Sequence, residues 1–337
     1  MHGWIILDKP LGLGSTQAVS AVKRALREGG YGKHKVGHGG TLDPLATGVL
    51  PIAVGEATKL SGRMLDADKA YDFTIRFGSE TDTLDREGVE VATADVRPTL
   101  AAVEAVLARF TGLIAQVPPA YSAIKIDGER AYDRARAGET FEIRTRDVVV
   151  HALTIAEEEE GPHPTLSRER ERVSDAQAST PRLLLPLAGE GRDEGLLPPH
   201  SLGLDQITLS ARVSKGTYIR SLARDIAHAL GTVGHVAMLR RTKAGPFTLG
   251  SAISLDKLGE AAKARALEAI TLPLTAGLDD IPALSVDPDQ ARALRQGRTL
   301  IGTAARHGLH LAIAGDTPVA LVEAIGPEIR VVRGFNL

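Results

Sequence analysis

The residue best suited to chemistry is Asp43, which stands in a glycine-rich stretch at residues 37–51 and directly precedes Pro44. Glycine permits backbone conformations that other residues avoid, and a proline disfavours the helical region for the residue before it. The stretch therefore predicts a carboxylate on an extended or turn backbone, anchored by the apolar run 49–54. The alternative is an ordinary turn, since Asp before Pro is a common turn opener.

Two groups of basic residues accompany this carboxylate. Lys33, His34, Lys35 and His38 lead into the glycine-rich stretch, so a basic rim and the acid belong to one surface. Such a surface suits an anionic polymer, although a solvated loop is the simpler explanation. The second group lies at a predicted strand-to-helix corner and comprises Lys215, Tyr218, Arg220 and Arg224. Such a corner indicates an anion site, because the free backbone N–H groups and the positive end of the helix dipole meet there.

An alternating strand over residues 69–77 places Tyr71, Phe73, Ile75 and Phe77 on one face. Core packing explains the row, but Tyr71 comes first, where its ring could also stack on a base. The acidic turn at 78–85 has too few oxygen ligands for a cation site, so we interpret Asp82 and Asp85 as turn residues.

The remaining pattern supplies the elements that must position these side chains. We expect strands at 4–7, 141–155, 206–213 and 239–242, and helices at 56–66, 99–110 and 130–136. Two further helices should begin at caps formed by Ser15 and Thr217. Short strands near 309–314, 319–324 and 329–335 favour a small β module at the C-terminal end.

Composition narrows the class of protein. The chain has 337 residues, enough for one large and one small domain, and 43% hydrophobic residues, which is ordinary for a soluble core. It has no cysteine, which excludes disulfides and thiol nucleophiles. The sequence shows neither a signal peptide nor an apolar run of membrane-spanning length, so we expect a cytoplasmic protein without membrane contact.

The formal net charge of −2 is unevenly distributed. Residues 157–203 hold ten acidic and five basic side chains, so the rest of the chain has three more basic than acidic ones. A mildly basic body can bind RNA where its cations cluster. Because residues 157–203 lack any sustained hydrophobic period, we interpret them as a disordered insertion, with an RNA-binding arm as the alternative.

Seven blocks, in this order, resemble the bacterial tRNA pseudouridine-55 synthases of the TruB family. The resemblance covers residues 4 to about 258 apart from the insertion. The window around Asp43 varies slightly from the more familiar threonine-then-glycine spelling, but the aspartate and its flanks match. The blocks are residues 7–10, 37–51, 69–71, 81–83, 121–125, 214–220 and 239–241. The resemblance implies an α/β (α+β) catalytic domain on a mixed, mainly antiparallel sheet. It also implies an isomerase that converts a T-loop uridine of tRNA to pseudouridine by base flipping, without cofactor or metal.

The resemblance also assigns roles to single residues. Asp43 would be the catalytic carboxylate, acting as nucleophile or base, and Arg220 would pair with it. Tyr71 would stack on the flipped base, and His38 would lie near the flipped nucleotides. The positions of Lys9, Tyr218 and Leu239 would line the pocket, although a structural role fits Lys9 and Pro10 better.

The expected domains are a catalytic domain at 1–258, a linker at 259–280 and a PUA-like β-barrel at 281–337. In the family this barrel contacts the acceptor arm of tRNA, and we expect a monomer. Three alternatives stay open: the C-terminal part could be a generic β module, and the whole chain a non-catalytic tRNA-binding module or a phosphate-handling hydrolase. The hydrolase would need a lysine-serine loop ending or a metal-ligand cluster, which the sequence lacks.

Overall fold

A single large sheet forms the body of the protein in the computed structural model, which describes residues 1–126, 128–156 and 203–337. Its strands follow the order β14-β1-β3-β12-β4-β11-β10-β7, with β2 beside β3 and β13 beside β12. Only the β12–β3 pairing is parallel, so the sheet is mixed and mainly antiparallel, as predicted. The strands are β1 (Gly3–Lys9), β2 (Val36–His38), β3 (Ala46–Val54), β4 (Lys69–Phe77), β7 (Gly112–Gln116), β10 (Arg146–Ile155), β11 (Gln206–Val213), β12 (Gly234–Ala244), β13 (Phe247–Thr248) and β14 (Leu272–Pro273).

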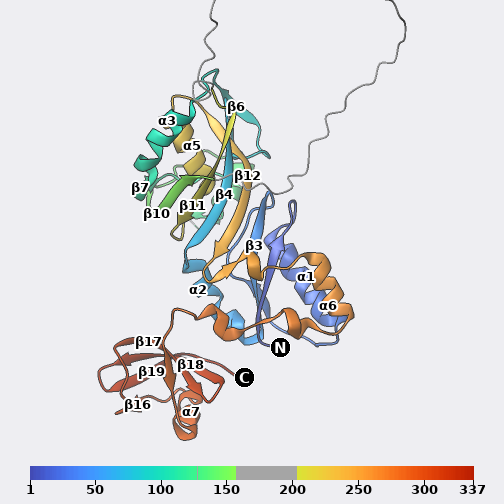
Figure 1. Ribbon diagram of the computed structural model, residues 1–337, viewed down its shortest axis with the longest axis vertical. Helices are drawn as coiled ribbons and strands as arrows, with labels where there is room; N and C mark the ends of the chain where they lie inside the picture. Colours follow the sequence, from blue (N-terminus) through green and yellow to red (C-terminus); the bar gives the residue numbers. More distant parts are fainter. Residues whose placement is uncertain (127, 157–202) are drawn as a thin grey trace, which may run out of the picture.

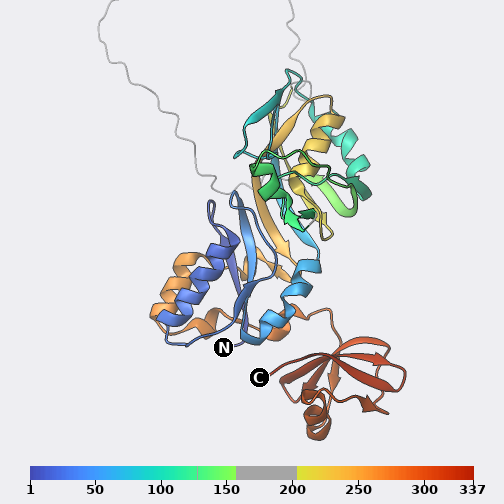
Figure 2. The ribbon, with the colours of Figure 1, turned by 180° about the vertical axis from the view of Figure 1, so that it is seen from behind.

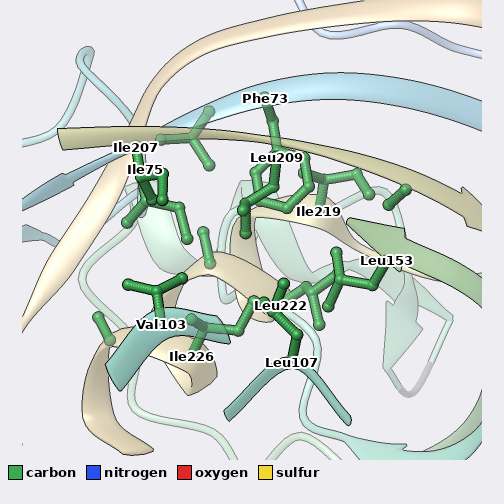
Figure 3. Close-up of a cluster of buried hydrophobic side chains, with 14 of the residues drawn as sticks. Phe73, Ile75, Val103, Leu107, Leu153, Ile207, Leu209, Ile219, Leu222 and Ile226 are labelled. Atoms are coloured by element: carbon green, nitrogen blue, oxygen red, sulfur yellow. The ribbon is translucent and has the colours of Figure 1, made fainter. Parts of the chain in front are cut away.

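Helices cover the two halves of the sheet separately. In one half, α1 (Ser15–Glu28) and α6 (Leu255–Lys263) lie side by side over β1 and β3 (Figures 1 and 2). In the other half, α3 (Leu100–Leu107) and α5 (Ile219–Ala229) pack against β4 and β11. Phe73, Leu209 and Leu222, buried between these layers, form part of the core of that half (Figure 3).

Short elements connect the two halves. The 3₁₀ helix η1 (Gly55–Leu60) continues into α2 (Ser61–Asp66), and η2 (Ala108–Phe110) extends α3. Two small hairpins stand outside the main sheet, β5 (Ser79–Thr81) with β6 (Glu90–Thr93) and β8 (Lys125–Ile126) with β9 (Glu129–Arg130). The second hairpin leads into α4 (Ala131–Arg136).

A five-stranded sheet forms the C-terminal part, in the order β15-β17-β18-β19-β16. One face of this curled sheet holds α7 (Pro288–Arg295), and the arrangement is compatible with the expected PUA-like barrel. Leu311, Leu321 and Phe335 pack against Trp4 and Leu60 of the body, so the two parts share an apolar contact. The strands are β15 (Ala283–Ser285), β16 (Leu300–Ile301), β17 (Gly308–Ala314), β18 (Thr317–Ile325) and β19 (Glu328–Gly334).

The segment preceding this part is tied to the body by α6 and by β14, which pairs with β1. It also contains η5 (Leu267–Ile270) and η6 (Leu274–Gly277), whereas η4 (Leu249–Ser251) precedes α6. The domain boundaries at 258 and 281 stay predictions.

Both predicted helix caps are wrong. The N-cap of α1 is Gly14, and the hydroxyl of Ser15 instead exchanges hydrogen bonds with the backbone of Leu42, at 2.8 and 2.9 Å. The N-cap of α5 is Tyr218, while the Thr217 hydroxyl donates to the carbonyl of Ser214. In both cases the hydroxyl forms a hydrogen bond outside the helix, with the backbone of Leu42 for Ser15 and with the carbonyl of Ser214 for Thr217, and therefore does not cap the helix.

The interpretation of residues 157–203 as a disordered insertion falls on 157–202, which lie outside the described residues. The strands on either side are well defined, because β10 and β11 pair antiparallel with Ile155 opposite Leu209. Among the described residues no helix is both long and apolar enough to cross a membrane.

Candidate active site

A cavity of about 880 Å³ opens where the two halves of the sheet meet. Four of the predicted substrate-binding residues and the predicted catalytic acid line it, although they come from four separate segments; they are Asp43, Tyr71, Tyr218, Arg220 and Leu239. The parallel pairing of β12 with β3 brings Leu239 opposite Ala46, three residues after Asp43. The topology of the sheet therefore assembles a site that the sequence distributes over almost two hundred residues.

Asp43 is held by the predicted arginine. The Oδ2 atom of Asp43 lies 3.0 Å from Nη2 of Arg220. The carboxylate side chain is 42% exposed to the cavity, whereas the arginine side chain is only 9% exposed. Since this ion pair joins Asp43 to a planar guanidinium that is itself nearly buried, Arg220 orients an acid that stays open to a ligand.

Arg220 itself is fixed from behind. Its Nη1 donates to the carbonyl of Thr83 at 2.8 Å, and its Nη2 donates to the carbonyl of Tyr121 at 3.1 Å. A second carboxylate, Asp85, lies 3.4 Å from Nη1 and is only 11% exposed. The guanidinium therefore bridges two acids, one buried and one facing the cavity.

Asp85 is the site residue that sequence reasoning missed. We interpreted it as a turn residue, and its carboxylate does accept from the hydroxyl of Thr83 and the amide of Glu87, at 2.6 and 3.0 Å. Those local bonds orient it toward Arg220, which lies 135 residues away in sequence. The local sequence around Asp85 is that of an ordinary turn. Predicting this contact would have required information on which distant residues meet in the fold.

The loop that carries Asp43 is held on both sides of the acid. Ser15 binds Leu42 through two hydrogen bonds, and the amide of Gly12 donates to the carbonyl of Pro44 at 2.9 Å. The Nζ of Lys9 also donates to the carbonyl of Pro44, at 3.2 Å. The backbone next to Asp43 is therefore pinned in place before any substrate arrives.

Lys9 lies beneath this loop and does not line the cavity, which favours the structural role over the substrate-binding one. It is fully buried, and its ammonium donates to three carbonyls, those of Pro10, Leu13 and Pro44. Burial lowers the pKa of Lys9 to about 8, because removing a charge from water disfavours its charged form.

Arg241 supports the opposite side of the same loop. It is 1% exposed, and its guanidinium donates to the carbonyls of Gly40, Thr41 and Val49 at 2.7 to 3.3 Å. The strand approaches it closely at Gly48, where φ is +99° and a Cβ would lie 2.2 Å from the carbonyl oxygen of Arg241. Glycine at this position is therefore required by both conformation and space.

The aromatic residues of the site border the cavity from β4 and from the N-cap of α5. Tyr71 is the third residue of β4 and lies opposite Ala211 on one side and Arg241 on the other. Tyr218 is fixed through its backbone, because its N–H and C=O both bond the side-chain amide of Gln116, at 2.8 and 3.1 Å. Burial raises the pKa of Tyr218, which keeps its hydroxyl neutral at physiological pH.

His38 is half-buried and stands next to the cavity without lining it. Burial, and then the charge of Arg241, lower its pKa, so the ring is neutral near pH 7. Its Nδ1 accepts from the amide of Gly40 at 3.4 Å, so in this structure His38 contributes to the same glycine loop.

The other cations of the predicted anion site are paired with acids. Lys215 lies 3.0 Å from Asp66, and Arg224 pairs with Asp225. Among the described residues no group of three or more His, Cys, Asp or Glu could hold a metal ion.

Models of known protein families match two parts of this chain. A family model described as TruB family pseudouridylate synthase (N terminal domain) matches residues 27–169, and one described as tRNA pseudouridylate synthase B C-terminal domain matches residues 220–279. A protein named tRNA pseudouridine synthase B from Novosphingobium aromaticivorans is 58% identical over all of this chain and 98% of its own length. One of the same name from Zymomonas mobilis is 55% identical over all of this chain and 96% of its own length.

Similarity to solved structures extends to the fold. A chain of a Cbf5-Nop10-Gar1 complex superposes with a TM-score of 0.66 at 24% identity, over 99% of this chain and 85% of that one. A chain of an H/ACA RNP bound to a substrate RNA gives a TM-score of 0.65 at 22% identity, with the same coverage. At this level of identity the likeness concerns the fold alone.

Proposed function

The chain belongs to the TruB family of pseudouridine synthases, and on this basis we propose how it acts as a tRNA pseudouridine synthase, an isomerase that converts a uridine of tRNA to pseudouridine. The observation that carries the proposal is the exposed Asp43 carboxylate, held at 3.0 Å by a nearly buried Arg220 inside a cavity. We infer that the carboxylate of Asp43 is the catalytic group, and that Arg220, itself paired with Asp85, positions it.

The reaction breaks the N1–C1′ bond, rotates the base, and forms a C5–C1′ bond in its place. The C5 hydrogen is lost as a proton and N1 gains one, so no external reactant is consumed. Asp43 acts on the sugar or on the base as nucleophile or base, because its carboxylate combines exposure to the cavity with a direction set by Arg220. Asp82, which also borders the cavity, is bonded to the Tyr121 hydroxyl and the Val89 amide.

A uridine must leave its base stack to reach Asp43, at a cost of a few kcal/mol. We assign Tyr71 to stack on the extruded base, and Leu239 and Tyr218 to form the walls around it, because all three border the cavity. Stacking on an aromatic ring contributes about 1–3 kcal/mol and can offset much of that cost. His38, neutral beside the glycine loop, is placed to help the neighbouring nucleotides open.

The substrate position we propose is uridine 55 in the T loop of tRNA. The C-terminal sheet, residues 281–337 in our assignment, would contact the acceptor arm, and the protein would act as a monomer. The shared apolar contact of Phe335 with Trp4 and Leu60 supports a fixed placement of the two RNA-contacting parts. A fixed placement would let both parts bind one rigid RNA.

The site of modification tests this proposal. Tritium at uridine C5 is released only where pseudouridine forms, so a tRNA transcript labelled at every uridine should release one equivalent. A matched transcript with cytidine at position 55 should release none. Equal release from both transcripts would contradict the assignment of the T-loop uridine while leaving the isomerase activity intact.

A further inference from the structure

A second hollow, of about 550 Å³, lies against α1 and the loop that follows it. It shares no lining residue with the catalytic cavity. Its wall is basic and includes no acid, since the residues that line it are Ser20, Lys23, Leu26, Arg27, Gly32, Lys33 and His34. We call it the α1 hollow. A concave surface lined by charges of one sign focuses its potential and attracts ligands of the opposite sign.

The cations of the α1 hollow are free to bind a ligand. Lys23, Arg27 and Lys33 are exposed, and within the described part of the chain none has an ion pair or a side-chain hydrogen bond. Glu268, which belongs to a neighbouring segment, is bonded to the hydroxyl of Tyr31 in the loop that follows α1. His34 Nε2 lies 2.9 Å from the carbonyl of Tyr31, which fixes the ring at the edge of the hollow.

Folding alone does not account for this arrangement. Lys23 and Arg27 are one turn apart on the same face of α1, where like charges repel by a few tenths of a kcal/mol. The negative end of the helix dipole offsets part of this at Arg27 in the last turn. Leu26, between them in sequence, is 1% exposed and lines the same hollow, so the backbone that carries both cations is anchored in the core.

The hollow lies at a defined distance from the reaction. Ser15, at the start of α1, is bonded to Leu42 beside the catalytic acid. Arg27 comes twelve residues later in the same helix, which corresponds to about 18 Å at 1.5 Å per residue. A folded tRNA is longer than this, so one RNA molecule can reach the cavity and the hollow together.

We propose that the α1 hollow binds backbone phosphates of the RNA substrate, away from the nucleotide that reaches Asp43. The proposal rests on the function proposed above, which supplies the RNA. Three long cations spread around an open hollow suit a run of phosphates, whose contacts are independent of base sequence. The hollow would thus add affinity and fix the direction of the RNA without touching the reacting base.

The test is the salt dependence of tRNA binding by a D43N protein, which separates affinity from turnover. The variant K23Q/R27Q removes two cations and relieves their mutual repulsion, so it should fold normally. Its control is K257Q/K263Q, which removes the same charge from exposed positions of the neighbouring α6. Circular dichroism melts verify that both variants are folded.

We expect K23Q/R27Q to bind tRNA about tenfold or more weakly at 0.1 M salt, with the slope of log K against log[salt] smaller by about 1.4 to 1.8. The control should keep the parent slope. The same slope in K23Q/R27Q as in the parent or in the control would overturn the proposal. Failure of the proposed function would look different, because the Asp43-containing parent would then release no tritium.

Discussion

Replacing Arg220 by lysine tests how the site holds its acid. The guanidinium has four acceptors within reach, namely the carboxylates of Asp43 and Asp85 and the carbonyls of Thr83 and Tyr121. An ammonium has three N–H groups, so at least one of the four contacts is lost. A hydrogen bond to a charged group contributes about 1.5–3 kcal/mol, which corresponds to about a 10- to 150-fold loss of rate.

The assay is single-turnover tritium release at saturating protein, with tRNA affinity measured separately. We expect R220K to lose rate by that factor while its Kd for tRNA changes by less than threefold, because the contact orients an acid rather than binding RNA. The control is R224K, one turn later on α5, where the arginine is paired with Asp225. A rate for R220K within threefold of the parent, or an equal loss in R224K, would refute the positioning role.

Three further predictions follow from other contacts. Burial and the charge of Arg241 lower the pKa of Lys69 to about 8. Between pH 8 and 10.5 the folded protein therefore binds fewer protons than the unfolded chain, and its free energy of unfolding rises with pH. In urea unfolding, the free energy of unfolding of K69M should rise less steeply than that of the parent over this range, by up to about 1.4 kcal/mol per pH unit. G48A should lose at least about 2 kcal/mol of unfolding free energy, because φ at Gly48 is +99° and backbone atoms occupy the position of a Cβ. The control G62A, where nothing lies within 4 Å of a Cβ, should be at least as stable as the parent. Equal stability of the two variants would contradict this prediction. Replacing residues 160–202 by a short Gly-Ser loop should leave melting temperature and tritium release near parent values, since the strands on either side already pair in register, and loss of folding would refute it.

Much of the fold could be predicted from local patterns. The alternation over 69–77 and 206–213 gave β4 and β11 with the observed bounds, because each strand buries one face on a large core. The strands β17 to β19 were also predicted close to their observed places. Periodicity predicts these elements well because it directly reflects burial.

The errors arose where tertiary contacts decided the outcome. Ser15 was predicted to cap α1, but it binds the loop that carries Asp43. Asp85 looked like a turn residue and pairs with Arg220. In each case the local pattern named the right type of residue, but its partner came from a distant part of the chain.

The Asp43–Arg220 pairing, in contrast, was anticipated from family resemblance, and the two side chains meet at 3.0 Å in the structure. The roles of Asp43, Tyr71, His38 and Leu239 in the reaction stay predictions. Their common cavity supports them, and only measurement of the reaction can test them.

The central claim is that Asp43 performs the chemistry, and the substitution D43N tests it most directly. Asparagine has nearly the same shape and can still accept from Arg220, so the fold and RNA binding should survive. The control D82N alters another acid that borders the same cavity. In single-turnover tritium release from C5-labelled tRNA, we predict no release above background for D43N, near-parent release for D82N, and similar tRNA affinity in all three proteins. Release by D43N at the parent rate would contradict the account.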